Sequence, residues 1–366
     1  MNTTLNIAFF GSSLVSAYWN GAATYYRGIL RALAERGHRI TFYEPDAYGR
    51  QQHRDIDDPD WAKVVVYSPE SRDEVRQLVR SCKGVDLLVK ASGVGIHDEL
   101  LEESVLELQS EHTRVVFWDV DAPATLDRIT QTPDDPLRML IPRYDFILTY
   151  GGGRPVIGAY ENLGARRCVP IYNALDATTH FPVEPEERFA ADLSFLGNRL
   201  GDREQRVEEF FFKVAANMPD LDFVLGGSGW EDKPLSENTR YLGHVPTKDH
   251  NAFNCSAKSV LNISRESMAR YGFSPATRVF EAAGAGACII TDAWEGIELF
   301  LMPDFEVLVA RDHREVEEHL ATLTAGRARA IGDAARRRVL SEHTYSNRVD
   351  QLESLLAIRP RILAAV

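Results

Sequence analysis

Residues 272–286 read GFSPATRVFEAAGAG and predict a helix that ends in glycines just before a strand. Helices and strands that alternate in this way along the chain predict the fold. Ser274 suits the N-cap of a helix and Pro275 suits its first turn, so the stretch predicts a helix over Ser274–Ala283. The glycines that follow end this helix. The apolar run Cys288–Thr291 then predicts a strand.

Short apolar runs alternate with helix-length amphipathic stretches on both sides of this unit. The predicted strands are Ile7–Phe10, Arg39–Tyr43, Val64–Tyr67, Val85–Ala91, Arg114–Trp118, Asp145–Thr149, Asp192–Leu196, Asp222–Leu225, Thr239–Leu242, Lys258–Ile263 and Glu306–Ala310. The predicted helices are Ala23–Arg36, Asp73–Cys82, Asp98–Ser110, Arg203–Asn217, Thr247–Ser256, Arg327–Ser341 and Tyr345–Ala357. Such alternation predicts an α/β protein of two Rossmann-like units with parallel sheets.

The periodicity is interrupted over Asn173–Glu187, where Asn, Asp, His and two prolines gather. We therefore expect an N-terminal domain over 1–175, a C-terminal domain over 176–342 and a closing segment over 343–366. In open α/β sheets, ligands bind beyond the carboxyl ends of the strands. Two facing domains of this kind predict a cleft between them, with a ligand on each wall.

The composition limits the partners that we expect. The formal net charge is −13, with 41 Lys and Arg against 54 Asp and Glu, which argues against general nucleic-acid binding and against attachment to an anionic membrane. The four cysteines are scattered, as in a protein with reduced thiols. Leu5–Gly11 resembles a first strand rather than a signal peptide. We expect a cytoplasmic protein without stable membrane insertion.

The opening stretch also predicts a ligand. The N-terminus of this predicted helix presents free N–H groups and a positive dipole end, which suits a diphosphate, and we assign Thr277 to donor binding there. Arg278 adds a bidentate phosphate contact, and Glu281, on the same helix face, can accept hydrogen bonds from ribose hydroxyls. The alternative is a surface Arg–Glu pair on an ordinary helix.

Two further motifs extend this prediction. LGNRLGDRE, residues 196–204, is a strand-to-helix turn whose glycines let backbone approach a phosphate, while Arg199 and Arg203 supply charge. YLGHVP, residues 241–246, ends a strand with His244, where backbone groups can meet a nucleobase edge. The alternatives are a plain loop with solvated arginines and a simple turn.

Together with residues 261–263 and 342–348, these motifs resemble the CgeB-type (spore maturation protein CgeB) glycosyltransferases of the GT-B superfamily, most closely over residues 190–350. The resemblance implies that the C-terminal domain binds a sugar nucleotide. It implies that Arg278 and Glu281 hold the diphosphate and ribose, with Arg199 and Arg203 assisting. It also implies a final helix that crosses back to the N-terminal domain. One departure is Phe273, which stands where many retaining GT-B enzymes carry a glutamate.

The N-terminal domain offers candidates for acceptor and chemistry. The loop Trp19–Thr24 follows the first strand, and we assign Gly21 in it to donor contact. The strand Arg114–Trp118 leads into Asp119 and Asp121, of which Asp121 is the candidate general base; the alternatives are a metal-binding Asp pair and an Asp that caps the next turn. His97 is a second candidate for base or donor contact.

The sequence therefore predicts a metal-independent glycosyltransferase that moves a sugar from a nucleoside-diphosphate sugar to an acceptor hydroxyl. The acceptor is a small molecule, a glycan or a protein, and no cofactor is expected beyond the donor substrate. A nucleotide-sugar epimerase on the same fold and a non-catalytic nucleotide-sugar binder are the alternatives. A dehydrogenase is disfavoured because residues 7–13 lack the dinucleotide-binding glycine pattern.

Overall fold

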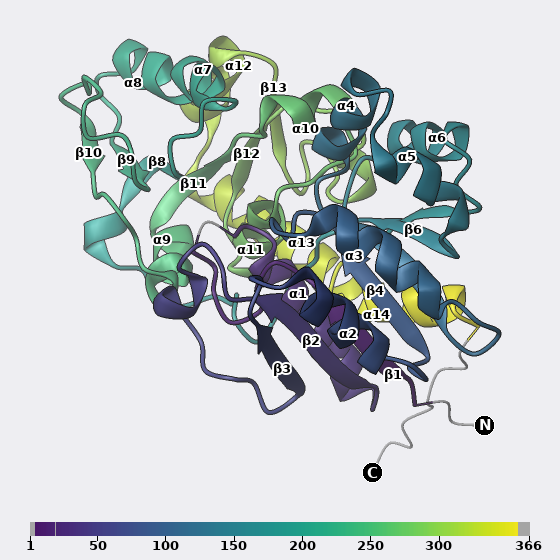
Figure 1. Cartoon of the computed structure of the whole chain (residues 1–366). Coiled ribbons are helices and arrows are strands. Elements are labelled where there is room, and N and C mark those ends of the chain that lie inside the picture. Colours follow the sequence, from purple (N-terminus) through teal and green to yellow (C-terminus); the bar gives the residue numbers. More distant parts are fainter. Residues whose placement is uncertain (1–3, 19, 358–366) are drawn as a thin grey trace. The chain divides into compact units, whose positions relative to one another are not determined.

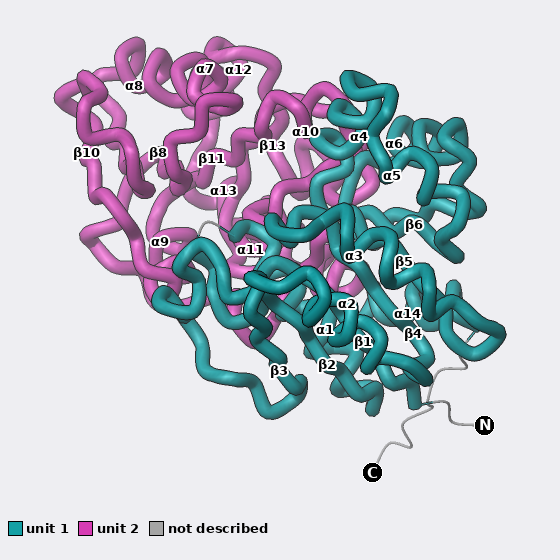
Figure 2. Tube along the Cα trace, in the orientation of Figure 1, with its two compact units in different colours: residues 1–172, 345–366 teal, residues 173–344 magenta. Residues whose placement is uncertain are grey.

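A computed structural model describes residues 4–18 and 20–357, so Trp19 of the predicted loop lies outside the described residues. The chain forms two compact units (Figure 2). Unit 1 comprises residues 1–172 and 345–366, and unit 2 comprises residues 173–344. The last helix, α14 (Tyr345–Leu355), thus belongs to the same unit as the N-terminal sheet.

Unit 1 is built on a seven-stranded parallel sheet of order β3-β2-β1-β4-β5-β6-β7 (Figure 1). Its strands are β1 (Asn6–Phe10), β2 (Arg39–Pro45), β3 (Ala62–Tyr67), β4 (Leu87–Ala91), β5 (Arg114–Asp119), β6 (Phe146–Thr149) and β7 (Cys168–Pro170). Its α-helices, besides α14, are α1 (Ala23–Glu35), α2 (Arg72–Ser81), α3 (Asp98–Ser104), α4 (Ala122–Gln131), α5 (Pro136–Leu140) and α6 (Gly153–Asn162).

Unit 2 repeats the plan with a six-stranded parallel sheet of order β10-β9-β8-β11-β12-β13. Its strands are β8 (Ala191–Leu196), β9 (Phe223–Gly226), β10 (Thr239–Tyr241), β11 (Ala257–Asn262), β12 (Ile289–Asp292) and β13 (Leu308–Ala310). Its α-helices are α7 (Glu204–Val207), α8 (Lys213–Asn217), α9 (His250–Ser256), α10 (Glu266–Tyr271), α11 (Thr277–Gly284), α12 (His313–Thr322) and α13 (Ala325–Glu342). The prediction of two parallel α/β sheets is confirmed.

Helices α1 and α14 pack closely within unit 1. Gly28 makes this possible, because a Cβ at that position would lie 2.0 Å from the Cε2 atom of Tyr345. Arg36 in the turn after α1 forms ion pairs with Asp350 at 2.6 Å and with Glu353 at 3.2 Å. The buried His38 also contacts Glu353, so this histidine has the structural role that its place beside the helix end predicts.

The two helices that carry the candidate diphosphate motifs differ from prediction. Helix α11 begins at Thr277, three residues later than expected, and its N-cap is Ala276 rather than Ser274. The predicted helix Arg203–Asn217 is interrupted by a π-helix over Glu208–Phe212, between α7 and α8. Strand β7 and helices α4, α5, α6, α10 and α12 lie outside the ranges predicted for strands and helices.

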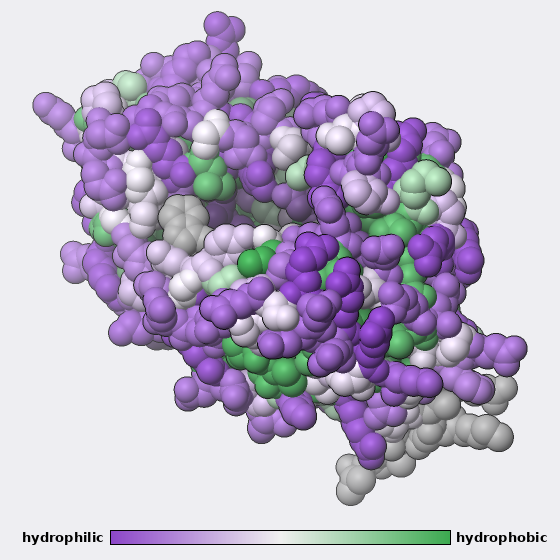
Figure 3. All heavy atoms as spheres, viewed as in Figure 1, coloured by the Kyte–Doolittle hydropathy of each residue, from purple (hydrophilic) through white to green (hydrophobic). Residues whose placement is uncertain are grey.

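Hydrophilic residues dominate the face drawn in Figure 3, with hydrophobic residues in smaller separate groups. Three exposed apolar side chains, Leu299, Met302 and Phe305, follow one another between β12 and β13. None of the helices in the described part of the chain has the length and apolar character needed to span a bilayer.

Candidate functional site

Two arginines that the sequence predicts as diphosphate ligands both lie close to one aromatic ring in unit 2. Phe195, the fifth residue of β8, is fully buried. The guanidinium carbon of Arg203 lies 5.6 Å from the centroid of its ring, and that of Arg278 lies 5.4 Å from the same centroid. Phe195 therefore joins the turn after β8 to the start of α11, and both cations gain a cation–π contact.

Neither arginine of this pair is bound directly by a carboxylate of the described residues. Among residues 4–18 and 20–357, no carboxylate forms an ion pair with Arg203 or Arg278. Burial, and next the charge of Arg278, lowers the pKa of Arg203 to about 10. Burial likewise lowers the pKa of Arg278, against the opposing charge of Glu281. The charge of Arg278 disfavours the charged form of Arg203, and an anion near both guanidinium groups would offset this effect.

The turn after β8 is shaped around Arg203. A Cβ at Gly197 would lie 2.8 Å from the Nη2 atom of Arg203, so a larger residue would push the guanidinium away. That Nη2 atom donates to the carbonyl of Asn198 at 2.6 Å, while the buried Nε has no hydrogen-bond partner among the described residues. Arg203 thus keeps donor capacity for a ligand.

The N-terminus of α11 lies beside this pair and has no side-chain cap. The N-cap Ala276 accepts no bond through a side chain, and the Ser274 hydroxyl instead donates to the carbonyl of Gly272 at 2.9 Å. Phe273, in the preceding turn, has a left-handed φ of 47°, which is strained for an aromatic residue. The first N–H groups of α11 are left to meet an external acceptor such as a phosphate oxygen.

Glu281 lies one turn along α11, near two histidines. The Nε2 atom of His180 is 3.8 Å from its carboxylate. The pKa of His250 is lowered by burial, and the charge of Glu281 opposes that shift. The Nε2 atom of His250 also contacts the carbonyl of Val245 at 3.2 Å. The loop that carries His244 is therefore held near Glu281.

Arg199 and His244 differ from Arg203 in their surroundings. The Arg199 guanidinium is bound by Glu204 at 2.7 Å and by Asp232 at 2.7 Å. These two carboxylates neutralise Arg199, in contrast to Arg203 four residues later. The His244 side chain is exposed, and only the backbone of its loop is held in place.

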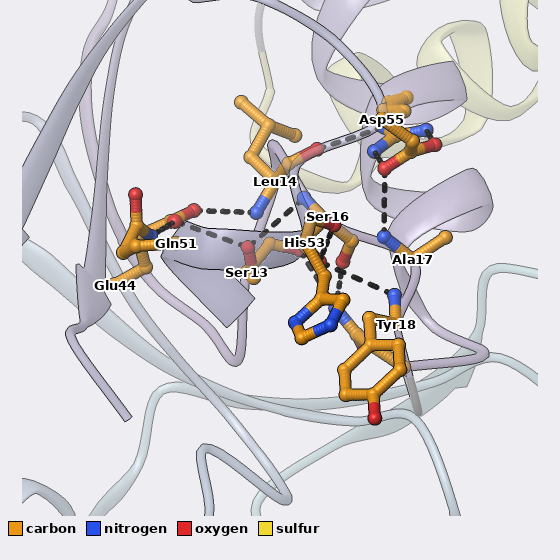
Figure 4. A network of polar contacts seen from close by, with 11 residues as sticks. Ser13, Leu14, Ser16, Ala17, Tyr18, Glu44, Gln51, His53 and Asp55 are labelled. Carbon is orange, nitrogen blue, oxygen red and sulfur yellow. Dashed lines mark hydrogen bonds and ion pairs between the residues drawn. The ribbon is translucent and has the colours of Figure 1, made fainter. Parts of the chain in front are cut away.

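In unit 1, the loop between β1 and α1 is fixed by buried polar contacts (Figure 4). Glu44, at the end of β2, accepts from the Ser13 hydroxyl at 3.0 Å and from the Leu14 amide at 2.6 Å. The Ser16 hydroxyl donates to the carbonyl of His53 at 2.7 Å. At the end of this loop, Gly21 is exposed just before α1, whose N-cap Ala22 makes no side-chain capping bond.

The two aspartates after β5 have separate environments. Asp119 is fully buried and accepts from the hydroxyls of Tyr160, Ser92 and Thr125. The carboxylate oxygens of Asp119 therefore have a structural role. Asp121 is half-buried at the N-cap of α4, and its side chain makes no capping bond to that helix. Of the pair, Asp121 is the more exposed.

His97 lies at the N-terminus of α3 with a left-handed φ of 57°. Its Nε2 donates to the carbonyl of Pro69 at 2.6 Å, which leaves Nδ1 as the nitrogen that can accept a proton. The next residue, Asp98, pairs with the fully buried Lys90 at 2.5 Å and accepts from the Gly95 amide at 2.7 Å. This network holds the loop that presents His97.

In the part of the chain that the structure describes, no three His, Cys, Asp or Glu side chains are grouped as metal ligands. Three further residues bear on the predicted site. Phe195 contacts Arg203 and Arg278, His180 contacts Glu281, and the charge of Glu281 acts on His250. No local motif marks any of the three.

Residues 203–354 match the family model described as glycosyl transferase-like. None of the curated proteins matches the sequence. By structure, the chain is similar to sucrose-phosphate synthase from Thermosynechococcus elongatus, at 13% identity, over 96% of this chain and 98% of that chain, with a TM-score of 0.69.

Two further solved structures are similar. HepE of Anabaena in complex with UDP is 13% identical, over 96% of this chain and 100% of that chain, with a TM-score of 0.70. An alpha-glucosyltransferase in complex with UDP-glucose and DNA containing an abasic site is 12% identical, over 97% and 100%, with a TM-score of 0.71. This chain has the GT-B fold, and its residues 203–354, from unit 2 into α14, match a glycosyl transferase-like family model.

Proposed function

We propose that this protein transfers a glycosyl group from a nucleoside-diphosphate sugar to an acceptor hydroxyl. The observation that carries the proposal is the pair Arg203 and Arg278, which share the ring of Phe195 without a carboxylate partner among the described residues. A leaving diphosphate is the group whose charge this arrangement would stabilise.

The donor is assigned to unit 2. Arg203, Arg278 and the first N–H groups of α11, from Thr277 onward, bind the diphosphate. Glu281 accepts hydrogen bonds from the ribose, and the backbone at His244 meets the base. A contact of Arg199 with the diphosphate, which the sequence predicts, requires Arg199 to exchange Glu204 and Asp232 for the ligand.

UDP is the first nucleotide to test, because HepE and the alpha-glucosyltransferase are each described in complex with it. In this proposal the two arginines and a helix end supply the positive charge for the diphosphate, and no metal ion takes part. The CgeB-type resemblance is part of the same proposal.

The acceptor is assigned to unit 1. Asp121 takes the proton of the acceptor hydroxyl as general base, or His97 does so through Nδ1. Gly21 lies in the loop before α1, where a bare backbone allows close approach of the donor.

Thermal unfolding with a panel of UDP, GDP, TDP and CDP species tests the donor assignment. A nucleotide at 100 times its Kd stabilises the folded state by about 2.7 kcal/mol, which is a measurable rise in Tm. Arg278→Gln should abolish that rise. Arg329→Gln, on an exposed position of α13, is the matched control and should retain it.

A panel without any nucleotide response would refute the donor assignment. A response that survives Arg278→Gln unchanged would place the nucleotide elsewhere. Assay of released nucleoside diphosphate with and without acceptors then separates transfer from epimerisation, which consumes no acceptor.

A further inference from the structure

Arg50 is a buried cation in unit 1 that the reaction scheme above does not use. It begins the short 3₁₀-helix Arg50–His53 after β2 and is only 8% exposed. Its Nη1 donates to the carbonyl of Ser12 at 3.2 Å and to that of Val94 at 3.4 Å. Arg50 therefore joins the loops that follow β1 and β4, where this sheet presents its carboxyl edge.

The charge of Arg50 has no direct partner. No carboxylate among residues 4–18 and 20–357 forms an ion pair with it, and its buried Nε has no hydrogen-bond partner there. Glu44 is the buried carboxylate whose charge reaches it. However, Glu44 already accepts from Ser13, Leu14 and Gln51, so it is committed to the β1 loop.

Burial lowers the pKa of Arg50, which shows that its charged form is poorly stabilised by the protein. The Tyr48 ring lies 5.1 Å from its guanidinium carbon. Tyr48 has a left-handed φ of 58° and is 58% exposed, and its hydroxyl donates to the Gly95 carbonyl at 2.5 Å. One face of the guanidinium is thus covered by a ring that itself borders solvent.

We propose that Arg50 is the anchor of an oxyanion subsite on unit 1, and that the acceptor carries a phosphate or carboxylate group. Guanidinium forks bind both of these groups through paired hydrogen bonds. That the bound oxyanion belongs to the acceptor rests on the proposed function. The oxyanion subsite itself is inferred from the geometry of Arg50 alone. The loop anchored through Val94 also presents His97, which places this subsite next to a candidate catalytic residue.

Binding of inorganic phosphate tests the subsite without a known acceptor. The titration is performed at constant ionic strength in the Arg278→Gln background, which removes one of the two arginines of the unit 2 site and so weakens its binding of phosphate. Melting temperature is followed as phosphate replaces chloride. Adding Arg50→Gln should raise the apparent Kd for phosphate about tenfold or more. Arg54→Gln, four residues along, exposed and paired with Asp58, should leave it unchanged.

Arg50→Met repeats the measurement if the glutamine variant does not fold, since methionine leaves no polar group buried. Equal phosphate titrations with and without Arg50, in whichever variant folds, would overturn the subsite. Because UDP does not enter this experiment, its result is independent of the donor assignment.

Matched acceptors then distinguish the two oxyanions. A hexose, its 6-phosphate and the corresponding hexuronate are compared in the UDP-release assay. We expect kcat/KM to be about tenfold or more higher for one of the charged acceptors than for the hexose, and Arg50→Gln to remove that preference. A preference that persists in Arg50→Gln would overturn the assignment to Arg50, and equal rates for all three would overturn the charged acceptor. Unchanged UDP binding by Arg50→Gln would show that the donor site is intact.

Discussion

At the scale of single residues, the partners of an arginine determine its role more than its place in a motif. Arg199 and Arg203 lie in one turn, yet Glu204 and Asp232 neutralise the first, whereas the second shares Phe195 with Arg278. The sequence motif predicts both arginines equally as phosphate ligands. Only the fold shows that Arg199 is paired with carboxylates whereas Arg203 has no carboxylate ion pair among the described residues.

Asp119 and Asp121 give a prediction at the same scale. Replacing Asp119 by Ala leaves the hydroxyls of Tyr160, Ser92 and Thr125 without their acceptor, so unfolding free energy should fall by about 1–3 kcal/mol or more. Asp121→Ala should abolish sugar transfer. Denaturant unfolding and the UDP-release assay measure the two effects.

The results for Asp119→Ala and Asp121→Ala together assign the roles of the two aspartates. Loss of transfer in Asp121→Ala with UDP binding retained supports an acceptor-side base. Full transfer by Asp121→Ala would shift that role to His97, and normal stability of Asp119→Ala would contradict the structural role of that carboxylate.

The sequence predicts Arg203, Arg278 and Glu281 as candidates because each has a local signal, namely a glycine-rich turn or a helix start. It does not predict that Phe195 joins the two arginines or that His180 and His250 approach Glu281. Those contacts depend on how β8, β11 and α11 pack. The residues that flank each side chain in the sequence do not predict how far apart these side chains lie in the fold.

At the scale of elements, alternation of strands and helices was predictable, and the helix ends were less so. Pro275 suits a first turn, yet α11 begins after it, because Gly272 and Phe273 adopt left-handed backbone and the chain straightens before Thr277. The π-helix over Glu208–Phe212 adds one residue to a turn, which periodicity over so short a stretch does not reveal.

Replacement of two helical glycines, Gly28 and Gly158, by alanine should have opposite effects on the free energy of unfolding. Gly28→Ala places a methyl group 2.0 Å from the Tyr345 ring, so α1 and α14 must separate, at about 1–3 kcal/mol. Gly158→Ala in α6 meets no atom within 4 Å and should stabilise by about 0.5–1 kcal/mol. Denaturant unfolding of both variants measures these changes.

Hydrogen exchange locates the effect of the first substitution. Faster exchange over α14 in Gly28→Ala is expected, with α11 unaffected. A Gly28→Ala protein as stable as the parent would contradict the close packing of α1 on α14.

At the scale of the whole molecule, the GT-B fold is shared with proteins of different acceptors, and fold alone does not choose among them. The alpha-glucosyltransferase of similar fold is described with DNA. This chain carries a net charge of −13, which repels a polyanion. We expect fluorescence anisotropy of a labelled DNA duplex to stay unchanged on adding the protein at physiological salt. Binding that weakens steeply with salt would contradict this expectation.

In the proposed donor site, Arg203 and Arg278 bind the diphosphate of a sugar nucleotide. Calorimetric titration of UDP and of uridine, each into the parent protein and Arg278→Gln, isolates that contact, because the two ligands differ only in the diphosphate. We expect Arg278→Gln to weaken UDP binding about tenfold or more and to change uridine binding little. Equal UDP affinity in the two proteins, or an equal loss for UDP and uridine, would contradict this assignment.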